Sequence, residues 1–151
     1  MRFPVLLGPL VLASSLSLAP SAAFAQTSSP APTDLTRART FSLEDAPSRT
    51  MPNGGKSYDL LRGTLTTGEV VGVHETTLPV GSKPNAAHII EHTELIMVRE
   101  GTVAFEHDGK AERVSAGGAI LVAVGTLHAM RNVGTIPATY FVIQIGGNTN
   151  K

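Results

Sequence analysis

The sequence contains no cysteine and no tryptophan, and only 5% of its residues are aromatic. Without cysteine, a disulfide and a lipid anchor on a cysteine are both excluded, so the stability of the fold must come from a buried core. The scarcity of aromatic rings argues against a carbohydrate-stacking surface and against an aromatic cage for cations. A cysteine nucleophile is impossible, and the serine-hydrolase pattern G-x-S-x-G is missing as well.

An excess of charge of either sign is also missing. Among 151 residues, 12 basic residues balance 12 acidic ones, and no basic patch stands out along the chain. Binding to nucleic acid or to an anionic lipid surface requires such a patch. We therefore expect neither nucleic acid nor an anionic membrane surface as a partner.

Long hydrophobic runs are missing apart from one near the start. Residues 5–18 form an apolar run, which is shorter than the roughly 20 residues that a membrane-spanning helix needs. The run follows a charged start at Arg2 and leads to small residues that end at Ala25, which is the layout of a secretory signal peptide. We predict that residues 1–25 are cleaved, leaving an exported protein, periplasmic or secreted, without a membrane anchor.

The composition of the chain changes twice after this segment. Residues 26–53 are rich in Ser, Thr, Pro, Ala and Arg and are predicted to form a flexible N-terminal arm. Phe41 and Leu43 alternate with polar neighbours and could add a short edge strand. A single β domain is predicted over residues 54–147, followed by a short tail at 148–151.

Within residues 54–147, short β-branched runs alternate with Gly, Pro, Asn and Asp. No window repeats apolar residues at helical spacing over three turns. Asp108-Gly109 predicts a type I′ hairpin, because both central positions of that turn need positive φ. The pattern favours an all-β sandwich or barrel. The predicted strands cover residues 57–62, 69–78, 86–90, 94–99, 102–107, 110–114, 119–124, 127–132 and 138–145.

Three histidines and one glutamate are spaced for a common site. His88, His92 and Glu94 are separated by even numbers of residues, so they face one side of an extended backbone, although a turn before Glu94 would disturb this at His92. His128 begins a distant strand, and in a barrel such strands can be neighbours. Two imidazoles and a carboxylate leave positions free on a divalent ion for water or substrate. His74 is interpreted as a strand-face residue and His107 as a solvated one.

Two groups of residues have spacings that match known motifs. The first consists of Gly81, His88, Glu94 and Gly101, with six residues between Gly81 and His88, one more than the motif has, and six between Glu94 and Gly101, as the motif has. The second consists of Gly117, Gly125, His128 and Asn132. These spacings resemble the two motifs of the cupin superfamily, which read glycine, five residues, His-x-His, three or four residues, Glu, six residues, glycine, and then glycine, five residues, Pro-x-Gly, two residues, His, three residues, Asn.

The resemblance implies a single cupin β-barrel of the jelly-roll type. It also implies that His88, Glu94 and His128 bind Fe, Mn, Ni, Co or Zn. Ile90 stands where the second histidine of the first motif is expected, and a hydrocarbon side chain cannot bind a metal. His92, two residues further on, is a candidate for the missing ligand. The proline of the second motif is replaced by Ala123.

Three interpretations of the site stay open. In the first, the metal binds and supports dioxygenase, isomerase or lyase chemistry on a small, largely neutral or aromatic molecule, with Glu94 as ligand or catalytic base. In the second, the loss of a histidine at Ile90 leaves a weak or empty site, and the pocket only holds a small molecule. In the third, the histidines make hydrogen bonds inside the barrel and Glu94 pairs with Arg99, Arg113 or Arg131.

The open edges of a short barrel also predict an assembly. An exposed edge strand invites pairing with another chain unless it is covered. We therefore expect a homodimer, with the Phe41 region or the strand at residues 57–62 as the covering element.

Overall fold

The computed structural model describes residues 33–147, which form nine β-strands and no α-helix. This part of the chain therefore contains no helix that could cross a membrane. The predicted signal peptide at residues 1–25 and the tail at residues 148–151 lie outside the described residues. The strands are β1 (Ser48–Thr50), β2 (Lys56–Thr64), β3 (Val70–Leu78), β4 (Thr93–Glu100), β5 (Thr102–His107), β6 (Lys110–Ser115), β7 (Ala119–Val122), β8 (His128–Asn132) and β9 (Ala138–Ile145).

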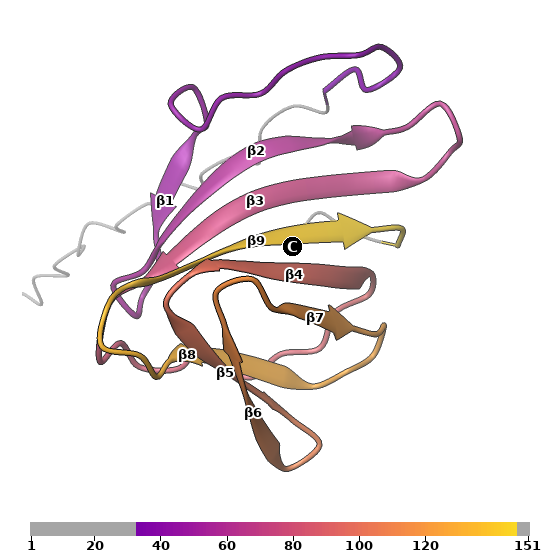
Figure 1. Cartoon of the computed structure of the whole chain (residues 1–151). Coiled ribbons are helices and arrows are strands. Elements are labelled where there is room, and N and C mark those ends of the chain that lie inside the picture. The colour runs from indigo at the N-terminus through magenta and orange to yellow at the C-terminus, as the bar shows by residue number, and fades with distance from the viewer. Residues whose placement is uncertain (1–32, 148–151) are drawn as a thin grey trace, which may run out of the picture.

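The strands form two antiparallel sheets. The larger sheet has the order β1-β2-β3-β9-β4-β7 and the smaller one the order β6-β5-β8. Figure 1 shows the smaller sheet lying against the half of the larger sheet that contains β4 and β7. Because β9 lies between β3 and β4, strands far apart in the sequence become neighbours. The prediction of an all-β fold of the cupin jelly-roll type is confirmed.

Alternation along the strands explains where the core lies. On β4, the side chains of Glu94, Ile96 and Val98 are buried while those between them are more exposed, as expected for a strand with one face inward. Burying one such aliphatic side chain contributes about 1.5–3 kcal/mol. The apolar core is Leu78, Ile90, Ile96, Val98, Val103, Phe105, Ile120, Val122, Met130, Ala138, Tyr140 and Val142.

The turn between β5 and β6 is the one that local chemistry predicts. Asp108 has a φ of 47° and Gly109 a φ of 71°, and His107 pairs with Lys110 on either side of them. Both central residues are therefore in the left-handed region that a type I′ turn requires.

Two segments differ from the prediction. Residues 86–90 do not form a strand, because only His88 pairs with β8, through an isolated bridge to His128. A strand does form at β1, where three exposed residues add to the edge of β2. Nothing in the Ser-Arg-Thr sequence of β1 marks it as a strand, since the pairing uses only its backbone.

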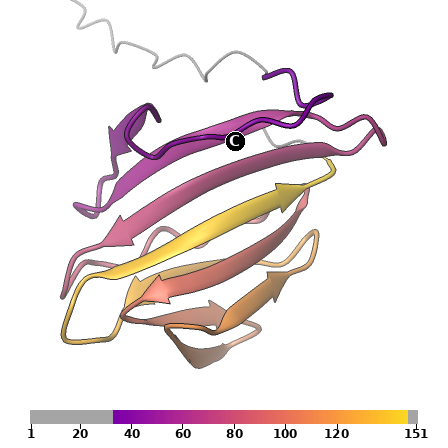
Figure 2. The ribbon, with the colours of Figure 1, turned by 45° about the horizontal axis from the view of Figure 1, so that its top comes forward.

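Residues 33–47 contain no regular strand, so the edge strand considered at Phe41 and Leu43 does not form. Figure 2 shows this segment running beside β2 before the chain enters β1.

Candidate functional site

A cavity of about 270 Å³ opens on the inner face of the larger sheet. All four predicted site residues line it, together with apolar side chains of the core. It therefore combines a small polar cluster with a largely apolar wall, as ligand sites commonly do. Its lining consists of Arg49, Met51, His74, Thr76, Asn85, His88, Ile89, Ile90, His92, Glu94, Ile96, His128, Met130, Tyr140, Val142 and Gln144.

The isolated bridge brings His88 and His128 together across 40 positions of sequence. The backbone N–H of each residue donates to the carbonyl of the other at 3.0 Å. Directly opposite residues in such a pair place their side chains close together, and the two imidazole centroids are 4.5 Å apart. His128 is buried, whereas His88 is exposed at the rim of the cavity.

Glu94 lies at the centre of the polar cluster. Its Oε1 is 2.9 Å from His92 Nε2 and accepts a hydrogen bond from Gln144 Nε2 at 3.3 Å. Its Oε2 is 3.9 Å from His128 Nε2. The side chains of Glu94 and His92 are 8% and 1% exposed, respectively, so this pairing takes place away from bulk water.

The tautomers of two histidines follow from their neighbours. His128 Nδ1 is 3.1 Å from the carbonyl of Thr126, and His88 Nδ1 is 3.2 Å from the carbonyl of Ala86. A carbonyl only accepts hydrogen bonds, so each Nδ1 is the donor. Burial lowers the pKa of His128, although the hydrogen bond to the Thr126 carbonyl opposes this shift. The lowered pKa favours the neutral ring. In a neutral ring of this tautomer, Nε2 has a free lone pair, and a carbonyl that accepts a hydrogen bond from Nδ1 is typical of metal-binding histidines.

The donor set fits a divalent transition metal in its chemistry. Three imidazoles and one carboxylate suit Zn, Fe, Mn, Ni or Co. Two donors bound to one ion at about 2.1 Å each lie about 3–4 Å apart, and Glu94 keeps such distances from His92 and His128. Nevertheless, within residues 33–147 no three His or acidic side chains are already arranged to hold an ion. Metal binding would require the hydrogen bond between His92 and Glu94 to open.

Comparison with known proteins identifies the fold family. The model of the cupin domain family matches residues 74–144, the stretch that carries the two motif spacings and all the side chains just described. The chain contains a domain of the cupin superfamily at residues 74–144. No curated protein matches the sequence.

Solved structures of other cupins show the same architecture. An RmlC-like cupin from Shewanella frigidimarina aligns with a TM-score of 0.60 and 18% identity, covering 74% of this chain and 95% of that one. A predicted oxalate decarboxylase from Thermotoga maritima aligns with a TM-score of 0.59 and 19% identity, covering 73% of this chain and 100% of that one. A sugar phosphate isomerase from Silicibacter pomeroyi aligns with a TM-score of 0.56 and 20% identity, covering 74% and 76%. At these identities the likeness concerns the fold.

Ile90 of this cupin is part of the apolar wall. The side chain is 4% exposed and belongs to the core cluster while also lining the cavity. His92 contacts Glu94 instead, from the position just ahead of β4. The histidine that contacts Glu94 therefore lies two residues further along the chain than the second histidine of the motif would.

Gln144 and His74 are among the cavity residues that were not predicted as site residues. Gln144 is placed beside Glu94 because β9 pairs with β4 in that register, and Gly72 of β3 is its other neighbour. A Cβ at Gly72 would lie 2.8 Å from Gln144 Oε1, so the glycine leaves room for the amide. His74, predicted as a strand-face residue, also lines the cavity. The only sequence signal for Gln144 was a polar residue inside an apolar strand.

Glu94 pairs with none of the three arginines considered for it. Arg131 donates to Glu106 at 2.6 Å, and Arg99 lies 3.3 Å from Glu75. Arg113 donates to a backbone carbonyl. The alternative in which Glu94 forms an ion pair with one of these arginines is therefore wrong, since imidazole and amide groups surround it instead.

Proposed function

We propose that this cupin is a metal-dependent enzyme that binds a divalent transition metal through His88, His92, Glu94 and His128. The observation that carries the proposal is the buried carboxylate of Glu94, which lies 2.9 Å from His92 and 3.9 Å from His128 in a largely apolar cavity. The hydrogen bonds from Nδ1 of His88 and His128 to backbone carbonyls support the proposal, because they leave Nε2 of each ring to face the metal.

The residues of the cavity favour proton-transfer chemistry of the isomerase or lyase type. When bound, the ion would act as a Lewis acid that polarises a substrate carbonyl. Glu94 would serve as ligand or as the base that takes a proton from the substrate, with the His92 imidazole and the Gln144 amide orienting its carboxylate. The apolar wall formed by Ile96, Met130 and other core residues excludes water and suits a small, largely neutral molecule.

A second function is favoured by a different observation. Ile90 removes one donor of the motif, and the donors that are present do not yet form a metal geometry within residues 33–147. On this alternative the cavity binds a small organic molecule without catalysis, and the histidines act as hydrogen-bonding partners inside the barrel.

Metal binding tests the first proposal. We would titrate the metal-free protein with Co(II) and follow both the heat of binding and the visible absorption of the bound ion. The expected result is one equivalent in the wild type and loss of tight binding in His128→Ala and Glu94→Gln. His107→Gln is the matched control, because His107 makes its contacts with Asp108 and Glu112 outside the cavity. Equal binding by all four proteins would refute the site.

A gain-of-function variant separates the two candidate functions. Ile90→His restores the motif histidine at a position that already lines the cavity. If the cavity is a weakened metal site, this variant should bind Co(II) at least about tenfold more tightly, a gain of about 1.4 kcal/mol. No gain in affinity, with the variant still folded, would favour the non-catalytic binding function.

We further propose that the mature protein is exported and forms a homodimer. The edge of β2 is not free for pairing between chains, because β1 of the same chain covers part of it. The outer strand β7 ends the larger sheet and exposes Leu121, which is 69% accessible, so we place the dimer contact there. Light scattering on the purified protein measures this, and a monomer at micromolar concentration contradicts it.

A further inference from the structure

Residues 33–47 are the part of the predicted N-terminal segment that precedes β1, and they are called the arm below. The arm is attached to β2 at both ends. At the first end, Thr33 N donates to the carbonyl of Arg62 at 2.6 Å, and Leu35 forms a parallel bridge with Leu65. At the other end, the arm leads directly into β1, which pairs with the start of β2. The arm therefore spans the length of β2 as a structured part of the fold.

The first attachment depends on a glycine. A Cβ at Gly63 would overlap the carbonyl oxygen of Thr33 and would lie 3.0 Å from Leu35 Cγ. No side chain larger than hydrogen fits where the arm meets β2, which is a recognised reason for glycine inside a strand. The close approach of the arm is thus built into the sequence of β2.

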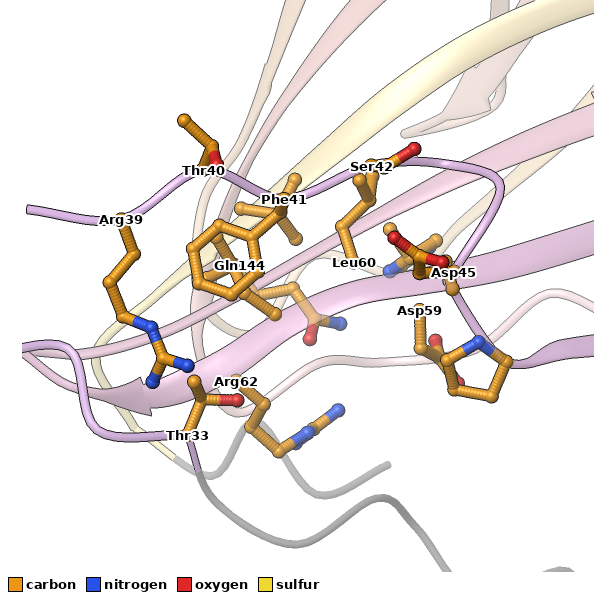
Figure 3. Close-up of a pocket in the computed structure, with 15 residues that line it drawn as sticks. Thr33, Arg39, Thr40, Phe41, Ser42, Asp45, Asp59, Leu60, Arg62 and Gln144 are labelled. Carbon is orange, nitrogen blue, oxygen red and sulfur yellow. The ribbon is translucent and has the colours of Figure 1, made fainter.

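The arm does not fill the space that it covers. A second cavity of about 310 Å³ lies between the arm and the sheet. Charged side chains from both parts line it: Arg39 and Asp45 from the arm, and Asp59 and Arg62 from β2. Figure 3 shows Arg39 at one end of this cavity, Asp45 and Asp59 at the other, and the Phe41 ring between them.

The second cavity adjoins the first at two shared residues. His74 and Gln144 line both. Gln144 directs Nε2 to Glu94, and its Oε1 is buried without a hydrogen-bond partner within residues 33–147. A buried acceptor without a partner destabilises the fold. A ligand that supplies an N–H donor near this boundary would satisfy it.

Three charged side chains of the second cavity, those of Arg39, Asp45 and Asp59, can interact with a ligand that carries both a positive and a negative charge. Within residues 33–147, neither Asp45 nor Asp59 forms an ion pair, and the Arg39 guanidinium contacts the Asp34 carbonyl and the Phe41 ring rather than a carboxylate. A molecule with a single charge would meet like charge on one side of the cavity, which disfavours its binding. A zwitterion meets opposite charge on both sides.

We propose that the arm cavity binds a small zwitterion of the amino-acid type. Its carboxylate lies toward Arg39, and its ammonium group lies toward Asp45 and Asp59. None of these three charged side chains is among the proposed metal ligands, because they belong to the arm and to β2. It extends the cavity system of the protein beyond the histidine cluster.

Four probes with the same number of carbon atoms test the proposal on the full mature chain. Norleucine and ε-aminocaproate carry both charges, at short and long separation, whereas caproate and hexylamine carry one each. Calorimetric titration should show that at least one zwitterion binds about tenfold more tightly than both singly charged probes. The proposal is overturned if caproate or hexylamine binds as tightly as the zwitterions, or if none binds at millimolar concentration.

Substitutions assign the binding to the arm. R39Q should weaken zwitterion binding by about tenfold, the effect of losing one charge-assisted contact, and should leave hexylamine unaffected. D45N should weaken the zwitterion and hexylamine but not caproate. R113Q is the matched control, since Arg113 is exposed and does not line the cavity. Unchanged zwitterion binding in both R39Q and D45N would also overturn the proposal.

Discussion

Acid should destabilise this cupin through His74. The ring lies on β3 between the two cavities. Burial lowers the pKa of His74 from 6.5 to about 4, a shift that Glu94 opposes and Arg49 reinforces. The folded protein thus holds this imidazole in its neutral form at pH values where a solvated histidine is already protonated.

The sign and size of the effect follow from the two pKa values. The unfolded chain binds the proton near pH 6.5, whereas the folded chain binds it only near pH 4. The free energy of unfolding is therefore unaffected above pH 6.5 and falls as the pH drops toward 4, by about 1.4 kcal/mol per pH unit. Over the whole window the loss is about 3 kcal/mol at most, because water in the cavities would reduce the shift.

Urea denaturation of the metal-free protein at several pH values measures this loss. The comparison is with His74→Asn, which removes the titrating group and keeps a polar side chain. Between neutral pH and pH 4 the wild type should lose about 3 kcal/mol more than the variant. An NMR titration should place the pKa of the His74 ring well below 6.5. A ring that titrates near its ordinary value, or equal acid sensitivity of the two proteins, would refute the reasoning.

Three further predictions concern the motif residues and the hairpin. Asn132→Leu should lower the free energy of unfolding by about 3 kcal/mol in urea, because the amide pairs with two backbone carbonyls and one backbone N–H; a variant of wild-type stability would contradict this role. Gly101→Ala should cost clearly more than Gly109→Ala, measured by thermal unfolding. Both glycines have positive φ, but a Cβ at Gly101 would lie 2.6 Å from a backbone oxygen, while the space at Gly109 is open; equal costs would be inconsistent with the clash. Hydrogen bonds that the His107 ring donates to the carboxylates of Asp108 and Glu112 raise the pKa of His107, so the charged ring stabilises the fold at low pH, and this contribution is lost as the pH rises through the raised value. Glu112→Gln should lower that pKa in an NMR titration.

Local sequence patterns predicted most strands, because the alternation of a strand and the chemistry of a turn depend on residues that are neighbours in sequence. Alternation along β4 and β9 and the turn chemistry at Asp108-Gly109 can be read within a few positions. Local patterns did not predict the strands correctly where the pairing depended on the backbone of a segment far away in sequence. The three residues of β1 become a strand only because β2 offers an unpaired edge, and residues 86–90 stay irregular because β8 accepts them at a single bridge.

The same division applies to the candidate site. The spacing of His88, Glu94 and His128 identified the residues that line one cavity, since motif spacing encodes which positions share the inner face of the barrel. The approach of Gln144 to Glu94 was not readable, because it depends on β9 crossing between β3 and β4.

The sequence by itself determined the strand pattern, the turns, the identity of the cupin motifs and the loss of one motif histidine at Ile90, because these depend on residue type and spacing alone. Only the tertiary structure decided that His92 pairs with Glu94 and that Gly72 makes room for the amide of Gln144. It also decided that the arm covers a second cavity beside the first. Those features arise from the register between strands and from the contact of segments far apart in sequence, neither of which a linear pattern records.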